Sequence, residues 1–239
     1  FEPNMNIATP ANYVVGPGDR VIIDIYGASQ KSEQFEVSPD GTITVDGFGP
    51  IYIAGLTVSA ANAKIKEQLG QRYKSSSVKM TVGQTRTITV NVMGEVTAPG
   101  TYTLSAFASC VHALYMAGGV TGVGTLRSIK VYRSGRQLTV VDVYDYILNG
   151  KLTGNVRLAD NDVIVVGPYD CLVDIAGQVK RPMAYEMRKG ESLATLLKYA
   201  GGFSAKAYKK GVQVNRVSGD QYSAHNVAEF DLSSFKLIR

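Results

Sequence analysis

Hydrophobic and polar residues alternate along the first third of the chain, and a period of two is typical of β-strands. The alternation covers Val21–Tyr26, Phe35–Val37 and Val78–Val82. The sequence Ser38-Pro39-Asp40-Gly41 has turn-forming residues where a tight turn needs them. It therefore predicts a hairpin, with Thr42–Val45 as the returning strand.

The apolar period changes ahead of the last of these strands and predicts one amphipathic helix. Thr57 and Ser59 offer side-chain oxygens that can cap its N-terminus. The helix should pack one face on a sheet and expose the other to solvent. Its apolar positions recur every four residues: Ala61, Ile65, Leu69 and Tyr73.

The rest of the chain contains one segment twice. Residues 92–133 and 175–216 align without a gap at an offset of 83 (177 − 94 = 83). The shared positions are mainly apolar residues, glycines and prolines, which build a scaffold rather than perform chemistry. The repeat thus predicts two modules that bind and assemble. Identical pairs include Gly94/Gly177, Val96/Val179, Pro99/Pro182, Tyr102/Tyr185, Leu114/Leu197, Ala117/Ala200, Val131/Val214 and Arg133/Arg216.

Each copy predicts a small α+β module of the β-grasp kind. Two strands precede a short helix, over 108–117 and 192–200, which ends at Gly-Gly, where glycine readily adopts the left-handed C-cap conformation. A further strand follows, at 129–133 and 212–216.

The copies differ after that strand. The first contains a short predicted helix, Tyr144–Leu148, and an apolar closing strand, Val163–Val166. The second shows no closing strand before Arg239. It is either trimmed or completed by residues outside this chain.

These patterns predict an α+β fold, a β-rich chain of several domains. The expected boundaries are an N-terminal extension at 1–12, an α+β domain at 13–85, a first β-grasp module at 86–168 and a second, incomplete one at 169–239.

Amino-acid composition and net charge exclude few classes of function. The net charge of +5 and the isoelectric point near 9.1 suit an acidic polymer, but no block of Lys and Arg concentrates the charge, and nucleic acid is not an expected partner. An apolar run of about 20 residues, as a membrane helix needs, is not found. Cys110 takes the place of Leu193 in the second copy and is expected to be a core thiol, while Cys171 lies in a strand-like run; a disulfide between them stays open.

Several motifs in order resemble the Wza-type outer-membrane polysaccharide export family. Tyr13-x-Val15-Gly16-Pro17-Gly18-Asp19, then Val37–Ile43, then Gly55-Leu56-Thr57 entering a helix are similar to the family's N-terminal export domain. The Gly-x-Val, Pro-Gly-x-Tyr and Ala-Gly-Gly pattern of residues 94–119 resembles its SLBB (soluble-ligand-binding β-grasp) domains, and residues 177–202 keep this pattern.

The resemblance implies a secreted lipoprotein of the periplasm and outer membrane of a Gram-negative bacterium. Its copies would form a homo-oligomeric ring, an octamer being one candidate, around a lumen for capsular or exopolysaccharide. An inner-membrane polysaccharide copolymerase or tyrosine kinase would be a further partner. The lipid-modified cysteine and the C-terminal amphipathic helix of the family are not found in this sequence, so the outer membrane would be reached through segments absent from this chain.

No residue is assigned to catalysis, a cofactor or a metal. The carboxylate pairs Glu33/Glu36, Asp142/Asp145 and Glu186/Glu191 are interpreted as solvated surface acids. Residues 16–19 are interpreted as a turn rather than a phosphate loop, because they precede a strand. His112, His225 and Asp160-x-Asp162 lack the partners of a metal site.

Two repeated residue types keep open roles. Tyr102 and Tyr185 are expected to pack in each module's core or to place a hydroxyl on the backbone rather than to stack on sugar. Arg133 and Arg216 either cap a strand or form a subunit contact. Positions that differ between copies, such as Lys180-Arg181 against Thr97-Ala98, are where assembly and polymer contact should be sought.

Two functions of different classes follow. The first is a non-enzymatic, ring-forming polysaccharide exporter whose mechanism is geometric. The alternative is a soluble periplasmic or surface β-grasp protein that binds a ligand as a monomer. A polysaccharide lyase or hydrolase is disfavoured, because no catalytic motif accompanies the carboxylates. The polymer, the subunit number and the lumen-facing residues are not predicted.

Overall fold

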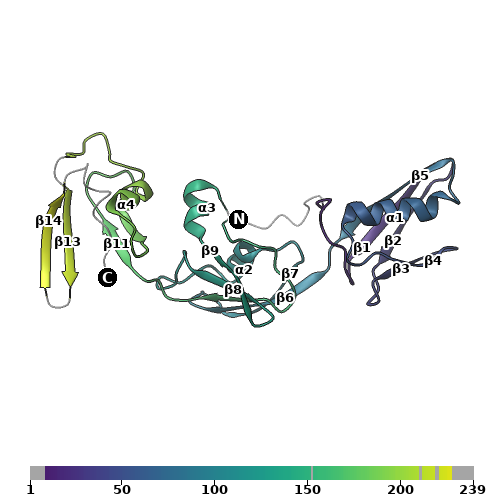
Figure 1. Ribbon diagram of the computed structural model, residues 1–239, viewed down its shortest axis with the longest axis horizontal. Helices are drawn as coiled ribbons and strands as arrows, with labels where there is room; N and C mark the ends of the chain where they lie inside the picture. The colour runs from purple at the N-terminus through teal and green to yellow at the C-terminus, as the bar shows by residue number, and fades with distance from the viewer. Residues whose placement is uncertain (1–8, 152, 210–211, 219–220, 228–239) are drawn as a thin grey trace.

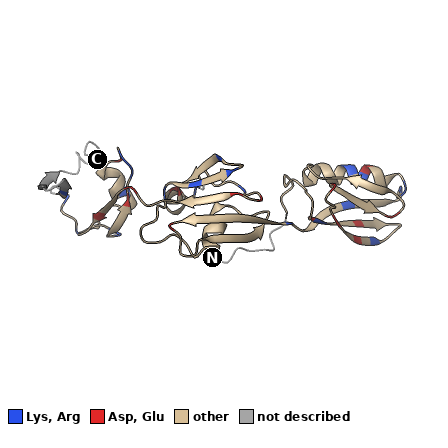
Figure 2. Ribbon diagram, turned by 90° about the horizontal axis from the view of Figure 1, so that it is seen from below, with Lys and Arg blue, Asp and Glu red and all other residues tan. Residues whose placement is uncertain are grey.

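The computed structural model describes residues 9–151, 153–209, 212–218 and 221–227, and these form an α+β, β-rich chain of three units in a row (Figure 1). The N-terminal, middle and C-terminal units follow one another along the longest axis of the molecule. Lys and Arg are scattered over all three units rather than gathered on one (Figure 2).

The N-terminal unit packs one helix on a sheet of order β2-β1-β5 and a two-stranded ribbon of β3 and β4 beside it. Thr57 caps the helix by accepting a hydrogen bond from the Ala60 N–H at 3.2 Å, and Ala61, Ile65 and Leu69 are buried as predicted. The elements are β1 (Arg20–Gly27), β2 (Lys31–Glu36), β3 (Thr42–Val45), β4 (Gly49–Tyr52), α1 (Val58–Gly70) and β5 (Ser76–Gln84).

Two expectations for this unit are wrong. The turn at Ser38–Gly41 forms, with the Gly41 N–H donating to the Ser38 carbonyl, but it does not close a hairpin. β2 pairs with β1 and β3 pairs with β4, so the turn carries the chain from one sheet to the other. The apolar period also continues past the helix, which ends at Gly70, so Tyr73 packs on the core from the turn that follows.

The middle unit is a five-stranded sheet of order β7-β6-β10-β8-β9. β10 is its central strand and pairs in parallel with β6 and antiparallel with β8. The elements are β6 (Thr87–Gly94), β7 (Gly100–Ser105), α2 (Cys110–Met116), β8 (Ile129–Arg133), β9 (Arg136–Val141), α3 (Val143–Asn149) and β10 (Val163–Val166).

The C-terminal unit repeats the first four strands and the first helix of this plan. Its β11 and β12 pair antiparallel, as do β13 and β14, but the two ribbons are separate sheets. The elements are β11 (Leu172–Ile175), β12 (Met183–Glu186), α4 (Leu193–Tyr199), β13 (Val212–Ser218) and β14 (Gln221–Val227).

The repeated tyrosine has the same role in both copies. The Tyr102 hydroxyl donates to the Ala98 carbonyl, and the Tyr185 hydroxyl donates to the Arg181 carbonyl at 2.9 Å. Both rings also pack on the core of their own unit. Core packing and a bond to the backbone, the two roles expected, thus occur together.

Candidate functional site

The first junction between units is built on one buried carboxylate. Asp19 is fully buried and accepts hydrogen bonds from the Tyr13 hydroxyl, at 2.8 and 2.9 Å, and from the Gly16 N–H at 2.8 Å. Arg86, in the two-residue connection between β5 and β6, donates to it from its backbone N–H at 2.7 Å and from Nη1 at 3.1 Å. This carboxylate therefore links the start of the N-terminal unit to the connection that leads from it into the middle unit.

Tyr13 extends this junction into the middle unit. Its ring is buried in that unit's hydrophobic core, with its centroid 4.9 Å from that of Phe107. Burial and the hydrogen bond to Asp19 raise the pKa of Tyr13 above its usual range, so the hydroxyl stays a donor. Because one side chain belongs to the sequence of one unit and the core of the next, the two units cannot rotate freely.

The Gly-Pro-Gly-Asp sequence serves the same junction. Gly16 lies under the Arg86 guanidinium, and a Cβ there would come within 2.7 Å of Nη1. Gly18 has a φ of +86°, a conformation that favours glycine. The motif is thus a turn that presents Asp19 to Arg86, and it precedes a strand as the sequence indicates.

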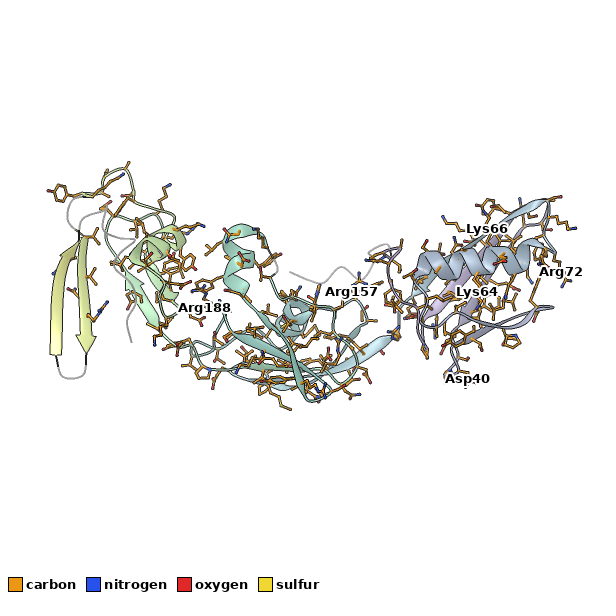
Figure 3. All side chains as sticks on the ribbon, in the orientation of Figure 1. Asp40, Lys64, Lys66, Arg72, Arg157 and Arg188 are labelled. Atoms are coloured by element: carbon orange, nitrogen blue, oxygen red, sulfur yellow. The ribbon has the colours of Figure 1, made fainter. Side chains whose placement is uncertain are left out.

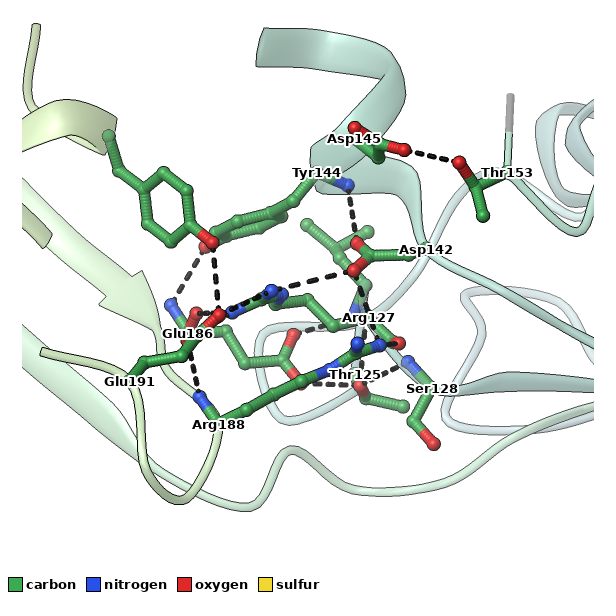
Figure 4. Close-up of polar contacts among 12 residues, drawn as sticks. Thr125, Arg127, Ser128, Asp142, Tyr144, Asp145, Thr153, Glu186, Arg188 and Glu191 are labelled. Atoms are coloured by element: carbon green, nitrogen blue, oxygen red, sulfur yellow. Dashed lines mark hydrogen bonds and ion pairs between the residues drawn. The ribbon is translucent and has the colours of Figure 1, made fainter. Parts of the chain in front are cut away.

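The second junction, between the middle and C-terminal units, is centred on Arg127 (Figure 4). Arg127 is only 5% exposed, and its two Nη atoms donate to the Glu191 carboxylate at 2.6 and 2.9 Å. Its guanidinium also lies over the rings of Tyr144 and Tyr199, 5.1 and 5.3 Å from their centroids. This is a bidentate ion pair enclosed by aromatic rings, an arrangement that suits arginine better than lysine.

Glu186 crosses the same interface from β12. Its side chain is buried and accepts from the Thr125 hydroxyl and from the Leu126 N–H at 2.8 Å. Its own backbone N–H donates to the Tyr144 hydroxyl at 2.8 Å. Each unit thus supplies both donors and acceptors to the other.

Asp142 and Arg188 close the outer side of this junction. Asp142 caps α3 by accepting from the Tyr144 N–H and pairs with Arg127 at 3.5 Å and Arg188 at 3.2 Å. Arg188, which Figure 3 labels between the two units, also donates to the Arg127 carbonyl. A cavity of about 350 Å³ opens beside these groups, lined by Asp142, Tyr144, Asp145, Asn149, Arg188 and Tyr199 among others.

Pairing fixes the charge states at this junction. Burial disfavours a charged Arg127, but the hydrogen bonds and charge of Glu191 outweigh it and raise the Arg127 pKa. Burial likewise opposes ionisation of Glu191, yet the bonds from Arg127 and the Arg188 N–H hold the Glu191 pKa below its usual value. Burial raises the Tyr199 pKa to about 12. All three groups therefore keep one charge state near neutral pH.

The interpretation of the acidic pairs is partly wrong. Glu33 and Glu36 do lie at the surface, where they pair with Lys31 and Arg20. Asp142, Glu186 and Glu191 instead form the second junction. The repeat held a signal for the two glutamates: Thr103 and Ala108 stand at their positions in the first copy. Nothing in the local sequence marks Arg127 as the partner of Glu191, or Thr125 and Leu126 as the partners of the Glu186 carboxylate, because these pairings span 60 to 64 residues.

The repeated arginine caps a strand, at least in the first copy. Arg133 forms a bidentate pair with the fully buried Asp162, at 2.8 and 2.7 Å, and donates to the Arg157 carbonyl at 3.0 Å. Asp160 accepts from the Thr89 N–H at 2.7 Å, so Asp160 and Asp162 serve the fold. The Arg181 guanidinium donates to the Tyr199 carbonyl at 2.8 Å, at the end of α4.

The remaining candidates have structural surroundings. Cys110 is buried, which raises its pKa to about 12, and both cysteines are free, so they do not form the disulfide that the sequence left open. His112 caps α2 through Ser109 at 2.9 Å, and the side chain of His225 lies outside the described part. Within the described residues, no three His, Cys, Asp or Glu side chains gather as metal ligands would, and no helix is long and apolar enough to cross a membrane.

The second junction is expected to weaken in acid. The folded-state pKa of Glu191 is lowered, so its contribution to stability is complete above its unfolded value near 4.5 and is lost as pH falls through the lower folded value. Denaturant unfolding of the C-terminal unit between pH 6 and pH 3 measures this. The Glu191→Gln variant should be less stable at pH 6 and should lose less stability on acidification. Equal pH slopes for the two proteins would contradict the assignment.

Comparison with known proteins agrees with this order of units. Residues 7–83 match the family described as polysaccharide biosynthesis/export protein, and residues 89–166 and 172–223 each match an SLBB domain. The polysialic acid transport protein KpsD of Escherichia coli is 33% identical over 74% of this chain and 32% of its own length. The EPS I polysaccharide export outer membrane protein EpsA of Ralstonia nicotianae is 30% identical over 75% of this chain and 48% of its own length.

An export domain followed by two SLBB domains defines the class of protein. The chain belongs to the Wza-type outer-membrane polysaccharide export family. It spans about a third to a half of the length of the curated relatives it matches.

Proposed function

We propose that this chain is the non-enzymatic, ring-forming part of a translocon that exports capsular or exopolysaccharide across the periplasm and outer membrane. The observation that carries the proposal is the pair of buried junctions. Asp19 with Arg86, and Arg127 with Glu191, join three β-rich units into one extended body. A ring that keeps an open lumen needs such rigid walls, because each subunit's width and tilt fix the lumen's diameter.

The proposed setting follows the family and the names of its members. Copies of the chain assemble into a closed ring, for which eight is a candidate number, and the polymer passes through the lumen. An inner-membrane copolymerase or tyrosine kinase contacts the ring. The mature protein is a lipoprotein of a Gram-negative outer membrane. The junction carboxylates and arginines pair with each other and are not placed to bind the polymer. A conduit also does not require tight binding, because tight binding would stop the polymer moving.

Deletion of the gene in an encapsulated host tests the proposal. Surface polysaccharide should be lost while polymer accumulates inside the cell, because synthesis does not need the exporter. The full-length gene supplied in trans should restore surface polymer. If surface polymer persisted at the parental level without the gene, the proposed function would be wrong.

The alternative, a soluble periplasmic or surface β-grasp protein that binds a ligand as a monomer, has one observation in its favour. The cavity at the second junction carries hydroxyl, carboxylate, amide and guanidinium groups that could bind a small polar molecule. Crosslinking of the full-length protein in whole cells, followed by fractionation, separates the two. Closed oligomers of defined mass in the membrane fraction support the ring, whereas a monomer in the soluble periplasmic fraction supports the alternative.

A further inference from the structure

The second copy of the repeat has cations on a surface where the first copy has none. Residues 95–126 of the first copy contain one acid, Glu95, and no Lys or Arg. The aligned residues 178–209 of the second copy contain two acids, Glu186 and Glu191, and have a formal charge of +5 (7 − 2 = 5). Their seven cations are Lys180, Arg181, Arg188, Lys189, Lys198, Lys206 and Lys209.

The two acids of this segment do not neutralise its surface, because both bind the middle unit. Glu186 accepts hydrogen bonds from Thr125 and Leu126, and Glu191 pairs with Arg127. Within the described part of the chain, the exposed side chains of Lys180 and Lys206 take part in no ion pair. The second copy therefore exposes positive charge that the acids of its own segment leave unbalanced.

One acid of the middle unit faces the edge of this surface. The pKa of Asp145 on α3 is lowered mainly by hydrogen bonds from Thr153 and Asn149, and nearby lysines, Lys198 among them, add to this effect. Asp145 is thus already bonded within its own unit.

The fold brings five of the cations together around the C-terminal end of α4, although no run of them stands out in the sequence. The loop between β11 and β12 bonds to this end, because the Lys180 N–H donates to the Gly202 carbonyl at 3.1 Å. The same loop holds the turn after α4, because the Ser204 N–H donates to the Gln178 carbonyl at 2.9 Å. We call this exposed group the α4 basic patch, and its members are Lys180, Arg181, Lys198, Lys206, Lys209 and Tyr208.

The β-grasp fold does not need these cations. The first copy makes the same two backbone bonds, from the Thr97 N–H to the Gly119 carbonyl and from the Thr121 N–H to the Glu95 carbonyl, each at 3.0 Å. A cation suits the C-terminal end of a helix, yet α2 ends at the equivalent place without one. The side chains at the patch positions of the first copy are all uncharged: Thr97, Ala98, Tyr115, Val123, Thr125 and Leu126.

The chemistry of the patch favours an acidic polysaccharide over a protein partner. Most of its cations are lysines, which are strongly hydrated charges on flexible stems and are depleted in protein interfaces. Such exposed charges attract anions at a distance and release them readily when salt screens the attraction. Tyr208 is 75% exposed and adds an aromatic face that can pack on the C–H groups of a sugar ring.

We infer that the α4 basic patch binds the carboxylate groups of an acidic polysaccharide, and that this is the polymer the protein exports. The inference rests on the proposed function for the source of the polymer but not for the binding itself. Binding is weak and sensitive to salt, so that the polymer can still move.

A short oligogalacturonate, which carries one carboxylate on each sugar, serves as the probe. Titrated into the 239-residue chain, it should shift the amide NMR signals of residues 178–181 and 201–209. The signals of residues 95–98 and 118–126, which form the equivalent loops of the first copy, should not move. The methyl ester of the same oligosaccharide has no charge and should not bind measurably.

A matched pair of double variants tests the residues. Lys180→Thr with Lys206→Val places the first-copy residues at two patch positions and should weaken oligogalacturonate binding roughly tenfold. Lys66→Thr with Lys79→Val removes the same charge from exposed positions of the N-terminal unit and should leave the affinity unchanged.

Absence of binding, equal binding of the methyl ester, or parental affinity in the variant at Lys180 and Lys206 would overturn the inference. Equal affinity for poly-glutamate would also overturn it, since the patch would then fit an acidic protein segment. Displacement of the oligogalacturonate by phosphatidylglycerol vesicles would do the same by indicating a membrane surface. None of these measurements depends on export, so their failure and that of the deletion experiment can be told apart.

Discussion

Replacing Arg127 with alanine is expected to release the C-terminal unit from the middle unit. The change leaves Glu191, only partly exposed, without its bidentate partner, and removes the group that covers Tyr144 and Tyr199. Breaking a buried pair by removing one partner costs about 3–5 kcal/mol. In the described part of the C-terminal unit, the buried residues of the hydrophobic core are Tyr185, Met187, Leu196 and Ala200, so this loss is a large share of the unit's stability.

Denaturant unfolding followed by hydrogen exchange measures this effect. Amides of β11, β12 and α4 should exchange at lower denaturant in the variant, whereas those of β6 to β8 should change little. Arg136→Ala is the matched control, because Arg136 lies exposed on β9 of the same unit. If Arg127→Ala and Arg136→Ala unfolded alike, the second junction would not hold the units together.

The change Asp19→Asn should loosen the first junction. Asparagine keeps the size of the side chain but removes the charge, and its amide nitrogen cannot accept from Arg86 or Gly16. Losing hydrogen bonds to a buried charged group costs about 1.5–3 kcal/mol, and Arg86, about one-third exposed, recovers part of its loss through water. Tyr13 should then pack less tightly in the middle unit, since its hydroxyl loses the charged acceptor.

Small-angle scattering and unfolding together test this change. The variant should lose stability in the N-terminal unit and should populate a broader range of overall lengths than the parent. Asp40→Asn makes the same chemical change at an exposed turn, which Figure 3 labels at the edge of the N-terminal unit, and should alter neither property. An Asp19→Asn protein with parental stability and length distribution would show that the carboxylate is not needed for the junction.

Periodicity predicted the fold well where an element's partners are local. The stripe of Ala61, Ile65 and Leu69 predicted the buried helix face, and the repeat predicted two modules whose first four strands and first helix follow in the same order along the chain. The hairpin at Ser38–Gly41 was wrong because turn chemistry specifies a reversal but not which strands pair across it. β2 pairs with β1, and β3 pairs with β4, in backbone ladders that no short window of sequence reveals.

The candidate site was less predictable because its pairs join distant segments. A glutamate on a strand looks the same in sequence whether its carboxylate faces water or accepts hydrogen bonds from residues 60 and 61 positions away, as that of Glu186 does. Differences between the two copies were the useful signal. Arg188 replaces Ser105 and Tyr199 replaces Met116 at equivalent positions. What the second copy adds beyond the shared scaffold is therefore largely the surface that binds it to the first.

We propose that two buried junctions hold the three units of this protein rigidly together, and that copies of it form the wall of a ring through which polysaccharide is exported. The most direct test measures surface and intracellular polysaccharide in the deletion host carrying full-length protein with Asp19→Asn, Arg127→Ala, Asp40→Asn or Arg136→Ala, at matched protein levels. The account predicts that the two control variants restore surface polymer, while the two junction variants leave polymer inside the cell. Full surface polymer with either junction variant, or in the host without any of these proteins, would contradict it.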